Sequence, residues 1–139
     1  MSEPALELQR AIYQALIASP ALNSAMGGTV RAFDRVPPRG ATFPYLTISE
    51  AQLLDDGVAC EDDMFEAFVD LHVWSRIVGQ AEAKTISGII RAEMMALTLA
   101  ADWQIKVSRV QATRHMNDPD GLTAHSVITC RFLLEPIGD

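Results

Sequence analysis

Apolar residues recur at intervals of three and four positions near the start of the chain, a spacing typical of one face of a helix. The stripe consists of Leu8, Ile12, Ala15 and Leu16. Ser2 is a residue type that caps helices, and Glu3 and Pro4 suit a first turn because acids favour the helix dipole and proline needs no amide partner there. The pattern therefore predicts a helix from about Glu3 to Ala18, ended by Ser19-Pro20.

Glycine and proline then divide the chain into short pieces. After a brief segment, Ala21–Met26, the pair Gly27-Gly28 allows a sharp reversal. We expect a short strand at Thr29–Phe33 behind it. The sequence VPPRG at 36–40 cannot lie inside a sheet because two of its residues lack amide donors, so it predicts a stiff, ordered loop.

Two strands are expected in the next part of the chain. Pro44–Ser49 is rich in β-branched and aromatic residues, whereas the acids and glycine of Asp55–Asp63 indicate a turn or mobile loop. Met64–Trp74 alternates with a period of two residues and is the clearest strand. Its apolar face holds Phe65, Ala67, Val69, Leu71 and Val73, and its polar face holds Glu66, Asp70 and His72. Because Phe68 and Trp74 also fall on the polar face, we expect something to cover part of it, a neighbouring subunit being one candidate.

Helical spacing returns after Gly79-Gln80 and predicts a second helix to about Leu97. Trp103–Ser108 alternates as a strand, DPDG at 118–121 is a strong turn signal, and His125–Leu134 closes the sheet. The expected class is α+β: a mostly antiparallel sheet with two main helices packed on one face and an extended hairpin near the C-terminus. We expect residues 1–139 to form a single domain.

The charge balance argues against a protein that grips nucleic acid. The chain has 139 residues, 49% of them hydrophobic, and a formal net charge of -7, with nine arginines and two lysines against 18 acids. Sequence-independent DNA binding depends on cations that neutralise phosphates. An acidic surface is still compatible with DNA that slides past without sticking, and it keeps single subunits soluble.

No pattern in the chain predicts catalysis, a cofactor or a metal ion. The histidines His72, His115 and His125 lack ligand spacing, and Cys60 and Cys130 form no CxxC pair, so we expect free thiols. Walker, GxGxxG, GxSxG and HExxH motifs are absent. The start of the chain lacks a basic segment followed by an apolar run, and no stretch approaches about 18 apolar residues, so we expect neither secretion nor a membrane span.

Isolated arginines against this acidic background are candidates for contacts with carboxylates of another copy, since a planar guanidinium suits bidentate pairing. Together with the residues on the mixed face of the long strand, they form a candidate subunit or partner interface. Its members are Phe68, His72, Trp74, Arg76, Arg109, Arg114 and Arg131.

The order of several short segments resembles the tail completion, or tail terminator, proteins of long-tailed phages and gene transfer agents. The segments are PYLTI at 44–48, LHVWS at 71–75, GQAEAK at 79–84 and DPDG at 118–121, and the similarity covers nearly the whole chain. None of them is a catalytic signature, so the resemblance depends on their joint order.

This resemblance implies a structural virion protein of the tail, assembled in the cytoplasm of a bacterial host. It implies a ring, usually of six copies, at the head-proximal end of the tail tube, where it ends tube growth and joins the tail to the head connector. The implied partners are sister copies, the tail tube protein and a connector or stopper protein. DNA would pass through the ring without specific binding, and no membrane is involved.

Two other hypotheses remain open at this point. The chain could be another component of the head-tail connector, because such proteins are also small, acidic and ring-forming. It could also be a cytosolic ligand-binding or enzymatic domain with a site formed by His72, Arg109 and Asp70. That second reading predicts a deep apolar pocket in which these three side chains converge.

Overall fold

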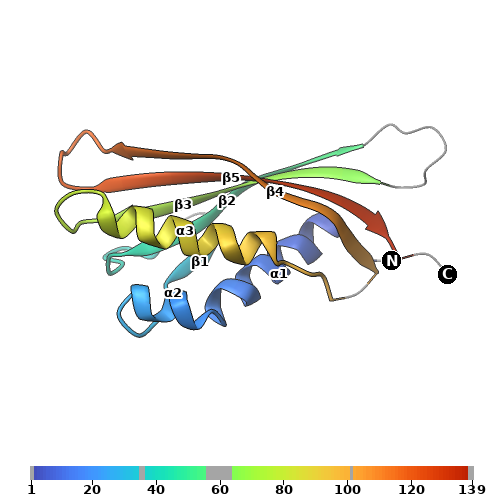
Figure 1. The fold of residues 1–139 in the computed structure, drawn as a ribbon, viewed down its shortest axis with the longest axis horizontal. Coiled ribbons are helices and arrows are strands. Elements are labelled where there is room, and N and C mark those ends of the chain that lie inside the picture. The colour runs from blue at the N-terminus through green and yellow to red at the C-terminus, as the bar shows by residue number, and fades with distance from the viewer. Residues whose placement is uncertain (1, 35–36, 56–63, 101, 138–139) are drawn as a thin grey trace.

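The computed structural model describes residues 2–34, 37–55, 64–100 and 102–137. Its elements, in chain order, are α1 (Pro4–Ile17), α2 (Pro20–Ala25), β1 (Ala32–Asp34), β2 (Tyr45–Asp55), β3 (Phe65–Ser75), α3 (Ala81–Met95), β4 (Trp103–Asn117) and β5 (Ala124–Pro136). The strands form one sheet in the order β1-β2-β3-β5-β4, in which only β1 and β2 pair in parallel. The helices lie on the same side of this sheet (Figure 1), so the expected α+β class is confirmed.

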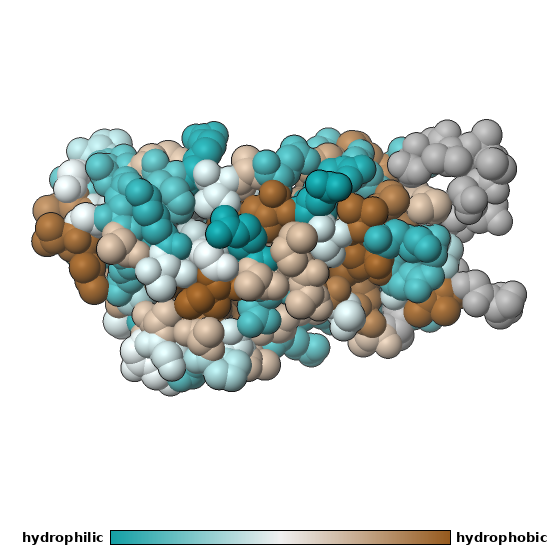
Figure 2. Space-filling view, viewed as in Figure 1, coloured by the Kyte–Doolittle hydropathy of each residue, from teal (hydrophilic) through white to brown (hydrophobic). Residues whose placement is uncertain are grey.

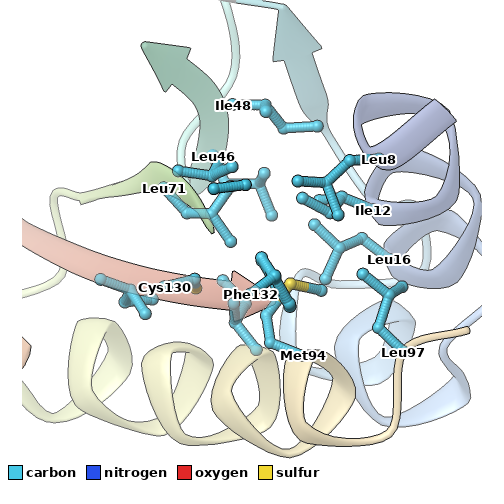
Figure 3. Close-up of a cluster of buried hydrophobic side chains, with 14 of the residues drawn as sticks. Leu8, Ile12, Leu16, Leu46, Ile48, Leu71, Met94, Leu97, Cys130 and Phe132 are labelled. Atoms are coloured by element: carbon cyan, nitrogen blue, oxygen red, sulfur yellow. The ribbon is translucent and has the colours of Figure 1, made fainter. Parts of the chain in front are cut away.

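The core lies between the helices and the inward face of the sheet. Every second residue is buried from Ala67 to Ser75 of β3 and from Ala124 to Leu134 of β5, as the alternation in the sequence predicts. Figure 3 shows these side chains meeting the apolar stripes of the helices. The largest fully buried members include Leu8, Ile12, Leu16, Leu71, Ile86, Ile90, Met94, Ile128 and Phe132. Each such side chain contributes about 1.5–3 kcal/mol of transfer free energy.

The start of the chain is capped differently from the prediction. The helix itself is confirmed to within a residue at each end, but the carboxylate of Glu3 caps it by accepting a hydrogen bond from the amide of Ala5 at 3.1 Å. Ser2 instead joins the terminus to the sheet. Its amide donates to Asp102 Oδ2 at 2.8 Å, and its carbonyl accepts from Trp103 Nε1 at 2.9 Å.

Ser19-Pro20 ends α1 and also starts α2. The Ser19 hydroxyl accepts a hydrogen bond from the amide of Leu22 at 3.2 Å, and Pro20 occupies the first helical position. The segment after Ser19 is therefore a short helix that the sequence analysis did not predict. Gly27 and Gly28 then reverse the chain with φ values of 86° and 108°, as expected.

Two strands are longer than predicted, and one is displaced. β1 begins at Ala32 rather than at position 29, while β2 continues six residues beyond Ser49 to Asp55. β4 continues to Asn117, and its pairing with β5 shifts at two β-bulges, between Ile105 and Val107 and between Val110 and Ala112. The acidic loop expected to follow Asp55 lies at 56–63, outside the described residues.

The loop before β2 is held by Arg31. Its Nε donates to the Pro44 carbonyl at 2.9 Å, and its guanidinium also donates to the carbonyls of Met26 at 2.8 Å and Phe43 at 3.5 Å. Pro37 and Pro38 lie in this loop, outside any strand, as predicted. One side chain thus joins the end of α2, the start of β1 and the entry to β2.

A candidate interaction face on the uncovered side of the sheet

The face of the sheet turned away from the helices is the candidate functional surface, here called the outer face. Directly paired residues of antiparallel strands lie on the same face of a sheet. The half-buried residues of β3 and β5, and their partners on β2 and β4, therefore lie on the outer face. The outer face includes Tyr45 and Gln52 of β2, Glu66, Phe68, Asp70, His72 and Trp74 of β3, His125, Val127, Thr129, Arg131 and Leu133 of β5, and Val107, Arg109, Ala112, Arg114 and Met116 of β4. Six of the seven residues predicted as an interface lie here, and Arg76 lies just beyond the end of β3.

A stack of aromatic and imidazole rings fills one end of the outer face. The ring of Trp74 lies 3.7 Å from that of His125, centroid to centroid, at an angle of 12°. His72 stacks against His125 at 4.9 Å, and its Nδ1 is 2.7 Å from His125 Nε2. Tyr45 continues the stack at 6.3 Å from Trp74. Of the two side chains predicted to need cover, Trp74 is covered in part by His125, whereas Phe68 lies outside this stack.

Burial sets the charge state of the two stacked imidazoles. It lowers the pKa of His72 and of His125, because the charged form is poorly solvated there. The His72 ring further lowers the pKa of His125, while Asp118, 3.6 Å from His125 Nδ1, raises it. For His72, the carboxylates of Asp70 and Glu50 raise the pKa and oppose the larger effect of burial. Both rings are therefore neutral at pH 7, one donating and the other accepting the hydrogen bond between them.

Arg76 makes its contacts within the chain. Its guanidinium lies over the ring of Phe43 at 4.3 Å, its Nε donates to Thr123 Oγ1 at 3.2 Å, and it is 4.0 Å from a carboxylate oxygen of Asp120. Asp120 in turn accepts hydrogen bonds from the amides of Leu122 and Thr123, which lowers its pKa. Arg76 thus ties the end of β3 to the β4–β5 turn.

The other arginines of the outer face differ in their pairing. Arg131 forms an ion pair with Glu66, its diagonal neighbour on β3. Arg109 lies directly opposite Arg131 across the β4–β5 pair, and Arg114 lies opposite Val127. Both β4 arginines are exposed, and within the described parts of the chain neither has an ion-pair partner. Their charges therefore remain available for contact with another molecule.

A shallow acidic hollow lies on the β2–β3 side of the same face. It is lined by Glu50, Ala51, Gln52, Phe68 and Asp70. Asp70 Oδ1 accepts a hydrogen bond from Thr129 Oγ1 at 2.9 Å, and Glu50 is exposed. The alternation of β3 predicts Phe68 and Asp70 on this face, whereas Glu50 lies beyond Ser49, where no strand is predicted.

The three side chains of the alternative enzymatic site do not converge. Asp70 borders the hollow, but His72 stacks with His125 and Arg109 lies two strands away on β4. The hollow is open rather than deep and apolar. Among the described residues, no group of three or more histidine, cysteine, aspartate or glutamate side chains is placed to bind a metal ion. The predicted site at these three positions is therefore wrong.

A separate apolar cluster is exposed at the end of the molecule beyond the ring stack. Ile77 and Val78, in the connection from β3 to α3, are 58% and 97% exposed, and Leu122 in the β4–β5 turn is 72% exposed. Figure 2 shows hydrophobic surface at the left end of the molecule, where the β3–α3 connection lies. No helix in the described part of the chain has the length and apolarity to cross a membrane.

Comparison with known proteins gives one family and two informative structures. Residues 10–135 match the family described as tail completion protein gp17. A chain in the structure "Virion of native gene transfer agent (GTA) particle" aligns with a TM-score of 0.77 and 21% identity, over 94% of this chain and 96% of that chain. "Structure of bacteriophage SPP1 gp17 protein" aligns with a TM-score of 0.58 and 23% identity, over 98% and 92% of the respective chains. At these identities the likeness shows a shared fold, and no curated protein matches.

Proposed function

This chain belongs to the tail completion protein gp17 family, and from that premise we propose that it forms a hexameric ring at the head-proximal end of a tail tube. Members of this family are structural proteins of the virion and not enzymes, so the chain is a tail component with a role in joining tail and head. In the proposal, the ring ends tube growth and then meets the head connector or stopper protein.

The observation that carries the proposal is the family match over nearly the whole length of the chain. The outer face supports it, since that face carries two exposed arginines without an ion-pair partner in the described part of the chain, and an open acidic hollow. Interfaces of this kind combine aromatic residues and arginine with a polar rim. Sister copies are the expected occupants, and the apolar cluster of Ile77, Val78 and Leu122 is available to a tube or connector subunit.

DNA has a passive part in this proposal. The net charge of -7 disfavours binding to phosphates, so a channel lined by such subunits would let DNA pass without specific contacts. A channel that bound DNA tightly would slow the passage of DNA from the head through the tail.

The test is deletion of the gene in cells that produce the particle, followed by electron microscopy of the products. We expect tails of uncontrolled length that are not joined to heads, and both defects should disappear when the gene is restored. Labelled protein should lie at the head-proximal end of the tube. Tails of normal length joined to heads in the deletion strain would contradict the proposal, and label at another level of the connector would assign the chain to a different joining protein.

A further inference from the structure

We infer that the β4 arginines of one copy bind the acidic hollow on the outer face of the next copy, and that this contact forms the seam of the ring. The inference rests on the proposed function and adds to it the two surfaces that meet. It makes the seam heterologous, with different residues contributed by the two sides.

The donor surface is β4, which contains basic residues and no acid. Its cations are Lys106, Arg109 and Arg114. Lys106 is engaged with Glu135 of β5 at 3.4 Å. Arg109 faces another cation, Arg131, and like charges directly opposite each other on a sheet are destabilising. Glu66 neutralises Arg131 through an ion pair, but no such partner neutralises Arg109 in the described part of the chain. A carboxylate of a second copy would neutralise Arg109 and so reduce the repulsion.

The acceptor surface has the opposite composition. β2 and β3 contain acids but neither lysine nor arginine. In the hollow, Glu50 is exposed and Asp70 has only one of its oxygens bound by Thr129. Phe68 also lines the hollow, and its ring offers a surface on which a guanidinium stacks. Two carboxylates beside an aromatic ring suit the planar, bidentate geometry of arginine.

The two surfaces cannot satisfy each other within one chain. β5 lies between β4 and β3, so the hollow is two to three strand spacings from β4, about 10–14 Å. A donor and an acceptor at separate places on one subunit generate a head-to-tail contact, which closes into a ring when the rotation between copies allows it. A two-fold symmetric pair can join the same two surfaces reciprocally, but it closes after two copies, so the number of copies bound per tail separates it from a ring.

DNA is the less favoured occupant of the β4 arginines. It would leave the acidic hollow without a partner, and it would meet the repulsion of a chain with a net charge of -7. A sister copy satisfies both surfaces at once.

The experiment uses two variants with altered charges, one for each surface, and their mixture. The donor variant is R109E/R114E, and the acceptor variant is E50R/D70N, in which asparagine keeps an oxygen for the Thr129 hydroxyl. Each is incubated with tails purified from the deletion strain, and the copies bound per tail are counted by native mass spectrometry. We expect each variant alone to self-associate at least about tenfold more weakly than the unchanged chain. Mixed in equal amounts they should assemble again, because each seam then joins opposite charges.

Arg91→Glu and Glu93→Arg on α3 are the matched controls, since they change the same charges on the helix side of the molecule. Both should assemble like the unchanged chain, and circular dichroism checks that every variant is folded. Normal assembly of the donor or acceptor variant alone would overturn the seam while leaving the ring intact. A mixture that fails while both controls assemble would also overturn it. If the unchanged chain forms no oligomer on tails, the proposed function itself fails and the seam with it.

Discussion

His72 and His125 meet across strands β3 and β5 with 2.7 Å between Nδ1 of one ring and Nε2 of the other. The contact needs one nitrogen with a proton and one without, so it exists only while at least one ring is neutral. Trp74 covers His125 from the same face and limits access of water to the pair. The stability of the outer face is therefore coupled to pH.

We expect the free energy of unfolding to decrease as the pH falls from about 7.5 to 5.5. Burial lowers the pKa of both imidazoles in the folded chain, whereas in the unfolded chain they titrate near 6.5. Below that pH the unfolded chain binds more protons, so acid favours unfolding. Urea denaturation at several pH values measures the slope. The variant H72Q/H125Q should lose most of it and keep only the part due to His115, whose pKa burial also lowers. An unchanged slope in that variant would contradict the assignment.

Arg31→Ala should destabilise the chain by about 2–3 kcal/mol, because hydrogen bonds from a charged donor to the carbonyls of Met26 and Pro44 are lost. Arg31→Lys should recover only part of this, since one ammonium cannot reproduce the directions of the guanidinium fork. Chemical denaturation measures both. Arg39→Ala, an exposed arginine in the same connection, is the control and should change stability by less than about 0.5 kcal/mol. Equal stability of Arg31→Ala and Arg39→Ala would show that Arg31 does not hold the loop.

Ser19→Ala should cost about 1 kcal/mol, because the amide of Leu22 loses its capping acceptor in a buried position. Ser24→Ala, at an exposed position within α2, should be neutral or slightly stabilising, as alanine favours helix. Thermal unfolding of the two variants side by side separates the cap from the residue type. A loss in Ser24→Ala as large as that in Ser19→Ala would exclude capping as the cause.

Cys130 should not react with a thiol reagent in the folded chain. Its side chain is fully buried, and burial raises the pKa of its thiol to about 12, so almost no thiolate is present at pH 8. Labelling a Cys60→Ser variant with a chromogenic disulfide, with and without denaturant, tests this. We expect one thiol to react only after unfolding. Rapid labelling without denaturant would mean that the β5 side of the core opens easily.

The sequence predicted the elements whose pattern is unbroken and missed those whose pattern is short or shifted. The long alternation of β3 gave the right element and the right buried face, and the repeated apolar spacing of α3 gave the right element. α2 has only six residues, too few to display a helical period. β4 was ended at Ser108 because each bulge shifts the inward and outward positions by one residue, so its second half no longer alternates in phase.

The candidate site followed the same rule. Phe68 and Trp74 stood out because they break a polar face, and the structure places both on the side without helices. The distance of Arg109 from Asp70, and the internal bonding of Arg76, depend on strand order and loop contacts that no local pattern contains. Glu50 was missed since a bulge between Ile48 and Ala51 hides the continuation of β2.

The bulges of β4 also affect the fate of a subunit before assembly. β4 is the outermost strand at its side of the sheet and has 15 residues, long enough to act as a template for another extended polypeptide. The two bulges disturb the regular spacing of its amide and carbonyl groups, so a straight incoming strand cannot pair with them along their whole length. Lys106, at the first bulge, also places a charge at this edge. The free subunit therefore resists pairing strand to strand into fibrils, while the side chains of β4 remain accessible to a neighbouring subunit in the ring.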